Sequence, residues 1–202
     1  MGCGNSYSLE EETKKYISKT EPRKDTKEFS YKEIESFFNP KSIAVIGVGE
    51  DPHKLGSLIL NNLKKAKYTG KLYPINTRVG GQVLYGHPSF KSIKEIQEPL
   101  DLAIFVVAAK FCSPIVDDCI ANGTKNISII AAGFSEIGNN ALENEIAEKC
   151  KKNNINLLGP NCLGHISTYT NLNASFADGY PEKGNVAFIS QSGAYCCAML
   201  DW

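Results

Sequence analysis

The sequence predicts an α/β fold in which an open parallel sheet is flanked by helices. Three continuous apolar runs, at residues 42–46, 102–107 and 127–130, are typical of strands that are buried on both faces. Segments with helical spacing separate these runs along the chain. Strands that alternate with helices form right-handed βαβ units, so the strands are expected to lie parallel in one sheet.

The other elements of this first domain follow in chain order. A short helix over 31–38 is expected to end at the Asn-Pro pair 39–40, and an apolar face indicates a helix over 56–67. A strand over 72–75 is expected near the sheet edge. Ser113 is expected to cap the next helix and Pro114 to open it. A helix over 141–152 and a strand over 155–158 complete the pattern.

The pattern changes after residue 164. A loop-rich stretch over 165–183 precedes an apolar strand over 186–189 and a helix that opens at 190–194. A single strand with part of one crossover connection cannot bury its apolar side chains without further strands and helices. We therefore expect one complete α/β domain over 31–164 and the beginning of a second α/β domain over 165–202.

Composition excludes several classes of protein. Lys plus Arg and Asp plus Glu number 22 each, and this neutral balance argues against a nucleic-acid partner. No apolar run reaches the roughly 18 residues of a membrane-spanning helix. The seven cysteines form no C-x-x-C pair and the three histidines are scattered, so no metal site is expected. The cysteines are interpreted as reduced, mostly buried thiols of a cytoplasmic protein, and the histidines as solvated or loop residues.

Residues 1–30 hold few apolar side chains and are expected to form a flexible tail. The tail begins with M-G-x-x-x-S, the pattern for myristoylation of Gly2. One myristoyl chain binds a membrane only marginally, so a second signal is needed, and Cys3 could accept palmitate. The alternative is a chance match to a short pattern.

Loops at the carboxyl ends of parallel strands are the expected ligand site. Residues 47–56 follow the first strand and open a helix, which suits an anionic phosphate. They do not form the dinucleotide fingerprint G-x-G-x-x-G, because Pro52 stands at the third small position and Asn76 stands where an acidic residue would bind ribose. No G-K-[ST] sequence marks a nucleotide-triphosphate loop either. A phosphate-bearing ligand other than NAD is indicated.

Six segments carry a resemblance to a known family. They are S-I-A-V-I-G at 42–47, P-x-K-x-G at 52–56, Y-P-I-N at 73–76, A-A-G-F at 131–134, L-G-P-N-C-L-G at 158–164 and S-Q-S-G-A at 190–194. In this order they resemble the N-terminal, Rossmann-like CoA-binding half of the NDP-forming acyl-CoA synthetases. That superfamily includes ADP-forming acetate–CoA ligases and the α subunit of succinyl-CoA synthetase.

The resemblance implies coenzyme A as the ligand and assigns residues to it. The implied contacts with CoA are Gly47, Gly49, Pro52, Lys54, Leu55, Gly56, Asn76, Arg78, Ala108, Ala109, Lys110, Ala131, Ala132 and Gly133. Arg78 could equally be a solvated surface residue, and residues 159–161 are interpreted as a hinge. Ser190, Ser192, Gly193 and Ala194 match a helix start that steadies a phosphorylated histidine, with plain helix capping as the alternative.

The implied reaction joins an acid to CoA with ATP, through an acyl phosphate and a phosphohistidine. In the family that histidine lies in the second, flavodoxin-like domain, beyond the residues present here, and an ATP-grasp domain or subunit binds ATP and Mg²⁺. The chain alone is therefore expected to bind CoA without turnover. Two other functions stay open: a stand-alone CoA-binding or sensing module, and an NAD(P)-binding oxidoreductase domain, which Pro52 and Asn76 disfavour.

Overall fold

The computed structural model describes residues 31–201. The expected tail over 1–30, including Gly2 and Cys3, lies outside the described residues. No helix within 31–201 is both long and apolar enough to cross a membrane. The same residues contain no group of three His, Cys, Asp or Glu side chains that could hold a metal ion.

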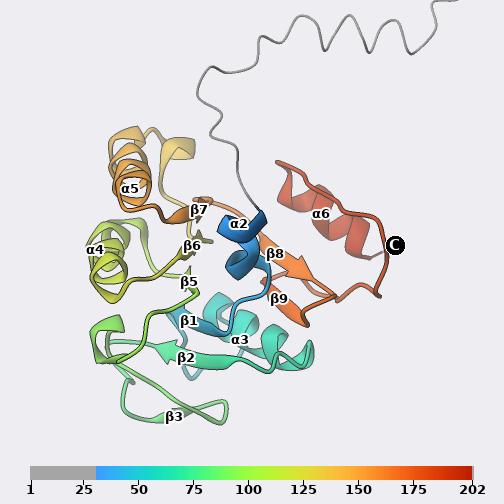
Figure 1. Ribbon diagram of the computed structural model, residues 1–202, viewed down its shortest axis with the longest axis horizontal. Helices are drawn as coiled ribbons and strands as arrows, with labels where there is room; N and C mark the ends of the chain where they lie inside the picture. Colours follow the sequence, from blue (N-terminus) through green and yellow to red (C-terminus); the bar gives the residue numbers. More distant parts are fainter. Residues whose placement is uncertain (1–30, 202) are drawn as a thin grey trace, which may run out of the picture. The chain divides into compact units, whose positions relative to one another are not determined.

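Five parallel strands form the central sheet, which confirms the predicted fold class (Figure 1). Their spatial order is β2 (Lys71–Ile75), β1 (Ser42–Ile46), β5 (Leu102–Phe105), β6 (Asn126–Ile129) and β7 (Asn156–Leu158). The helices are α2 (Tyr31–Phe38), α3 (Leu55–Lys65), α4 (Cys112–Asn122), α5 (Asn140–Lys152) and α6 (Gly193–Leu200). The strand that follows β1 along the chain, β2, pairs with one side of β1, and β5 pairs with the other side of β1.

Alternate side chains of the strands pack into two hydrophobic layers. Ile43 and Val45 of β1 face the layer that α3 covers, whereas Ala44 and Ile46 face the layer of α4 and α5. Figure 1 shows α4 and α5 together on one side of the sheet and α3 on the other. All of β1 is buried, because a central parallel strand is covered on both faces.

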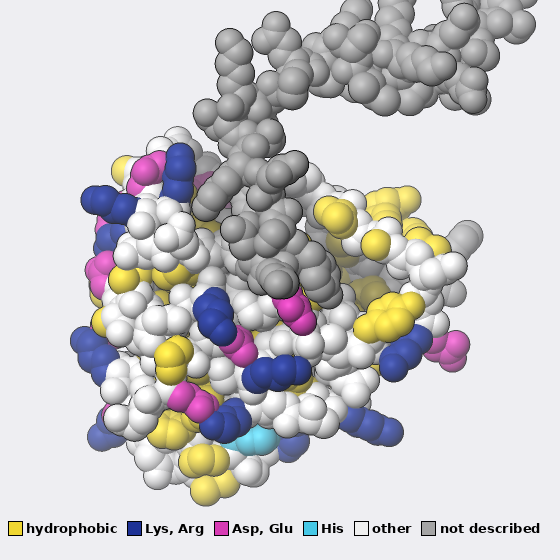
Figure 2. Space-filling view, in the orientation of Figure 1, with side chains coloured by type: hydrophobic (Ala, Val, Ile, Leu, Met, Phe, Trp, Pro, Cys, Tyr) yellow, Lys and Arg dark blue, Asp and Glu magenta, His cyan; other side chains and the backbone are white. Residues whose placement is uncertain are grey.

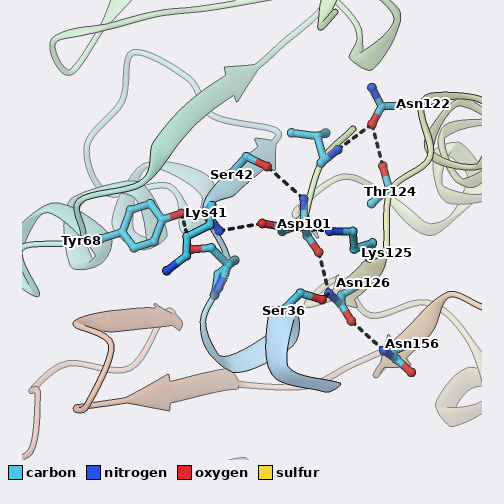
Figure 3. A network of polar contacts seen from close by, with 12 residues as sticks. Ser36, Lys41, Ser42, Tyr68, Asp101, Asn122, Thr124, Lys125, Asn126 and Asn156 are labelled. Carbon is cyan, nitrogen blue, oxygen red and sulfur yellow. Dashed lines mark hydrogen bonds and ion pairs between the residues drawn. The ribbon is translucent and has the colours of Figure 1, made fainter. Parts of the chain in front are cut away.

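A polar network joins the amino ends of the strands (Figure 3). Asp101 accepts a hydrogen bond from the backbone N–H of Lys41 at 2.8 Å and from Nζ of Lys125 at 2.7 Å. The buried Asn126 amide donates to the Asp101 carbonyl at 2.6 Å and to the Ser36 hydroxyl at 2.8 Å. These bonds fix the register of the strands at the edge opposite the expected ligand loops.

Two hairpins lie outside the central sheet, and one of them corrects the sequence prediction. β3 (Val83–Leu84) and β4 (His87–Pro88) form the first, and β8 (Gly164–Ser167) and β9 (Leu172–Ser175) form the second. The second hairpin occupies part of the stretch that was expected to be loop-rich. It packs on α3, where the Asn62 amide donates to the carbonyls of Ser175 and Ala177, both at 2.9 Å. The sequence did not predict these two short strands, because small and polar residues interrupt the apolar pattern of each.

The predicted strand over 186–189 is wrong. Val186 and Ile189 are 88% and 96% exposed, and no strand within the described residues pairs with this segment. Figure 2 shows hydrophobic side chains exposed in the region of α6. An apolar run without a neighbouring strand cannot satisfy its backbone groups as part of a sheet. The domain boundary after residue 164 stays a prediction.

The expected helix cap at Ser113 is also wrong. Helix α4 begins two residues earlier than predicted, at Cys112 instead of Pro114, after the 3-10 turn η2 (Ala109–Phe111), so Ser113 and Pro114 lie inside its first turn. The Ser113 hydroxyl instead donates to Glu145 and accepts from Nζ of Lys149 at 2.8 Å, both on α5. The tertiary contact between α4 and α5 replaces the local cap.

His165 lies in β8 and is not a solvated loop residue. Its ring stacks on Phe37 of α2, with centroids 4.3 Å apart, and its Nε2 donates to the Phe37 carbonyl at 2.9 Å. Its Nδ1 is buried and has no hydrogen-bond partner within residues 31–201. Burial lowers the pKa of His165 to about 4.

This buried imidazole makes the folded protein sensitive to acid. The folded chain binds the His165 proton only near pH 4, whereas the unfolded chain binds it from about pH 6.5. Stability is therefore expected to fall by about 3 kcal/mol as the pH drops from 6.5 to 4. Urea unfolding across this range measures the slope.

The variant His165→Phe keeps the stacking on Phe37 but cannot titrate, so it should lose most of that slope. The matched control His53→Asn, at an exposed position, should keep it. An unchanged slope in His165→Phe would contradict the assignment.

Candidate functional site

The loops after β1 and β5 meet where the strand order reverses. The backbone N–H of Gly47 donates to Ile75 of β2 at 2.8 Å, and that of Val106 donates to Ile46 at 2.9 Å. Gly47 has a φ of +105°, and a Cβ on it would lie 2.5 Å from the Val106 carbonyl oxygen. Only glycine allows the two loops to approach this closely. This is the position at which open α/β sheets bind ligands.

The loop over 47–54 leads directly into α3. The Ser57 hydroxyl donates to the Gly49 carbonyl at 3.0 Å and ties the loop to the first turn of the helix. A Cβ on Gly56 would lie 2.5 Å from the Gly47 carbonyl oxygen, so this glycine lets α3 pack against the end of β1. No side chain caps the amino end of α3, which leaves its first backbone N–H groups available to an anion.

The exposed part of this loop carries the other predicted contacts. Pro52, Lys54 and Leu55 are exposed, and the backbone of Lys54 is extended where the helix begins. Gly56 takes the close-packing role that the dinucleotide fingerprint gives to its third glycine, but four residues later than the position of Pro52. The loop is therefore longer than the one that suits NAD.

Asn76 connects the second strand to the first loop. Its amide nitrogen donates to the Val48 carbonyl at 2.8 Å, and its amide oxygen accepts the backbone N–H of Arg78 at 2.8 Å. Arg78 is exposed, and its guanidinium makes no hydrogen bond or ion pair with residues 31–201. Asn76 thus has a structural role in shaping the loop edge, while a role for Arg78 in binding stays a prediction.

The loops after β5 and β6 lie against each other. Gly133 has a φ of +112°, and a Cβ on it would lie 3.0 Å from the Cβ of Ala109. Ala108 and Ala132 are exposed, and Nζ of Lys110 lies 5.0 Å from the ring centroid of the exposed Phe111. Small side chains and backbone groups therefore dominate this part of the edge.

The last two predicted segments lie near each other. Ala131 accepts the backbone N–H of Asn161 at 3.0 Å, and a Cβ on Gly193 would lie 3.7 Å from the Cβ of Leu163. The start of α6 is thus next to the loop over 159–164. The Ser192 hydroxyl accepts the backbone N–H of Tyr195 at 3.3 Å, so Ser192 caps α6. A role of this helix start toward a phosphohistidine stays a prediction, as does the hinge at residues 159–161.

The cysteines follow the buried-thiol interpretation only in part. Cys112, Cys119 and Cys150 are buried, while Cys162, Cys196 and Cys197 are half-buried. Burial raises the pKa of Cys112 to about 11, as it does for Cys150. Thiols with raised pKa values are poor nucleophiles, so these two cysteines serve packing rather than chemistry.

Residues 41–168 match the family model described as CoA binding domain. The chain belongs to the CoA binding domain family. It is similar to the ADP-forming acetate–CoA ligase of Methanocaldococcus jannaschii, with 43% identity over 84% of this chain and 23% of that protein. It is also similar to the α subunit of ADP-forming acetate–CoA ligase II of Pyrococcus furiosus, with 45% identity over 80% of this chain and 35% of that subunit.

Solved structures agree with the sequence matches. The dinucleotide forming acetyl-coenzyme A synthetase 1 of Ca. Korarchaeum cryptofilum, in complex with phosphate and ADP, superposes with a TM-score of 0.79 and 38% identity. The alignment covers 83% of this chain and 36% of that one. The chain thus spans about a quarter to a third of the length of these relatives. These matches confirm the predicted resemblance to the acyl-CoA synthetases. The family model also confirms coenzyme A as the predicted ligand.

Sequence reasoning did not identify several residues that shape this CoA binding domain. The Ser57 hydroxyl and the Glu136 carboxylate bind loop backbone at the edge, and the Val106 carbonyl oxygen lies where a Cβ on Gly47 would be, so that only glycine fits there. A contact made by a backbone carbonyl cannot be predicted from the type of residue, because every residue has one. Glu136 does follow the A-A-G-F segment by two residues, and a carboxylate close to consecutive free N–H groups is a signal that could have been used.

The close approach at Gly56 gives a direct test of the site's geometry. Alanine is normally better than glycine inside a helix by about 1 kcal/mol. At Gly56, however, the added Cβ meets backbone at 2.5 Å, so Gly56→Ala should instead destabilise the fold by about 2 kcal/mol. Urea unfolding measures the change, and Gly184→Ala, where a Cβ meets nothing within 4 Å, is the control. A stabilised Gly56→Ala variant would contradict the packing described.

Proposed function

We propose that this chain binds coenzyme A along the carboxyl edge of its sheet. The supporting observation is that the loops after β1, β5 and β6 touch each other at Gly47, Val106, Ala109 and Gly133 without bulky side chains between them. A continuous line of accessible backbone suits a long ligand with several amide and phosphate groups. Membership of the CoA binding domain family supports the same ligand.

The phosphate groups of CoA would lie at residues 47–56. The uncapped start of α3 presents backbone N–H groups and the positive end of the helix dipole. Lys54 and Arg78 are exposed cations on the two loops that Asn76 joins, and both are suited to phosphate oxygens. In this proposal a neutral chain binds a highly charged ligand through local backbone groups and two nearby cations.

The pantetheine and adenine would lie along the remaining loops. Ala108, Ala109 and Lys110 form one side, and Ala131, Ala132 and Gly133 form the other. Their small side chains leave backbone groups such as those of Ala132 open to the amides of a pantetheine arm, whereas both polar backbone groups of Gly133 are bound by Glu136 and Asn139. Gly49 supports this arrangement because no contact within residues 31–201 explains its lack of a side chain: a Cβ there would meet only Asn76 Nδ2, at 4.0 Å.

The similar ligases suggest the larger activity. We propose that the chain supplies the CoA-binding part of an ADP-forming acyl-CoA synthetase, with an ATP-grasp domain or subunit as partner. In that arrangement Ser190, Ser192, Gly193 and Ala194 would face a phosphohistidine from a further domain. The exposed apolar side chains of Val186 and Ile189, and the exposed Tyr195 on α6, are consistent with further packing partners.

A stand-alone CoA-binding module is the second candidate, tethered to membranes through acylated Gly2 and Cys3. A cytoplasmic location suits either candidate. The transcript beyond codon 202 distinguishes them: an in-frame stop supports the module, whereas a continuing reading frame with an ATP-grasp sequence supports the synthetase. An NAD(P) oxidoreductase domain is disfavoured, because Pro52 and Asn76 replace the fingerprint residues and the loop is too long.

Calorimetric titration of the 202-residue chain with CoA, dephospho-CoA and NAD tests the proposal. CoA should bind in the micromolar range and NAD at least tenfold more weakly. The variant Gly49→Ala should bind CoA about tenfold more weakly with an unchanged melting temperature, because the new methyl group enters only the space proposed for the ligand.

The variant Gly184→Ala serves as the matched control and should bind CoA like the unmodified chain. Preference for NAD, or absence of CoA binding, would overturn the proposed function. Full CoA affinity in Gly49→Ala would contradict the placement of the ligand.

A further inference from the structure

The loop after β6 is held by side chains from the turn that follows it. The Glu136 carboxylate accepts the backbone N–H of Gly133, and both of its oxygens lie 3.2 Å from the backbone nitrogen of Phe134. The Asn139 amide donates to the Gly133 carbonyl at 3.1 Å. Both backbone polar groups of Gly133 are thus bound by side chains, while the buried Phe134 anchors the loop in the core.

Gly133 is also the point at which this loop meets its neighbour. Its backbone has a φ of +112°, and the space where its Cβ would lie is 3.0 Å from the Cβ of Ala109. A small rotation of the Gly133 peptide therefore changes the spacing between the loops after β5 and β6. Both loops belong to the proposed CoA site.

The hydrogen bonds from the loop backbone to Glu136 are strong, but they lie at the exposed surface of the protein. The hydrogen bond from the Gly133 backbone lowers the pKa of the Glu136 carboxyl, so the group is ionised at neutral pH. Hydrogen bonds to an ionised acceptor are about twice as strong as neutral ones. Glu136 is nevertheless exposed, so water can solvate the same N–H groups if the carboxylate is removed. The carboxylate therefore contributes to the conformation of the loop more than to global stability.

We infer that Glu136 and Asn139 are positioning residues for coenzyme A: they bind the two backbone groups of Gly133 and fix its loop against Ala109. Neither side chain needs to touch the ligand for this role. The inference rests on the proposed function and adds two residues outside the loop segments assigned to CoA. It also explains why the turn at 133–139 contains a carboxylate at an exposed position with a backbone partner.

Calorimetric CoA titrations of four variants test the inference, each paired with a thermal melt. Glu136→Ala should weaken CoA binding about tenfold, and Glu136→Gln only about threefold, because an amide oxygen still accepts one neutral hydrogen bond. Asn139→Asp should weaken binding about tenfold, since it removes the donor but keeps a residue type suited to the start of α5. All three should melt within about 2 °C of the unmodified chain.

Glu143→Gln is the matched control. Glu143 accepts the neighbouring backbone N–H of Ser135 at 2.9 Å but makes no bond to Gly133, so this variant should bind CoA within about twofold of the unmodified chain. Equal effects of Glu143→Gln and Glu136→Ala would overturn the inference, as would loss of affinity that only follows loss of thermal stability. Unchanged affinity in Glu136→Ala would overturn it and leave the proposed function intact. Failure of the unmodified chain to bind CoA would overturn both.

Discussion

The close approach of backbone to backbone at Gly47 is the constraint on which the rest of the site depends. On one side the Val106 carbonyl oxygen occupies the place of a Gly47 side chain, and on the other the absent side chain of Gly56 leaves room for the Gly47 carbonyl. These contacts bring β1, β5 and the start of α3 to one point. The loops can then present backbone groups to a single ligand, which a larger residue at either glycine would prevent.

The site is consequently made mainly of backbone, and its side chains act on that backbone. Asn76 binds the Val48 carbonyl, Ser57 binds the Gly49 carbonyl, and Glu136 binds the N–H groups of Gly133 and Phe134. This arrangement reconciles the neutral charge of the chain with an anionic ligand, because helix ends and free N–H groups do not contribute to a count of charged residues. The polar network around Asp101 and Asn126 fixes the opposite edge of the sheet.

The elements that the sequence predicts correctly are those that the local pattern of apolar residues determines. The runs predicted at 42–46, 102–107 and 127–130 contain the buried strands Ser42–Ile46, Leu102–Phe105 and Asn126–Ile129, because a parallel sheet covered on both faces requires continuous apolar sequence. Val106 and Val107 follow the end of their strand and are half-buried. Residues 186–189 carry a similar apolar run but are exposed and form no strand, since strand formation also needs a partner that sequence alone does not supply. Ser113 failed as a helix cap because Glu145 and Lys149 from a separate helix bind its hydroxyl. The hairpin at 164–175 was missed because its burial comes from α3, which is distant in sequence.

The motif segments and the rule for open sheets predict the candidate site at the carboxyl edge of the sheet, and this location stays a prediction. The contacts within that edge could not be predicted from the sequence, because the approach of Gly133 to Ala109 depends on tertiary distances. Backbone amide chemical shifts of the isotope-labelled chain, recorded during addition of CoA, test the central claim most directly. Our account predicts the largest shifts at residues 47–57, 76–78, 106–110 and 131–136, with little change around Asp101 and Asn126. Shifts concentrated at the amino ends of the strands, or no saturable shifts, would contradict it.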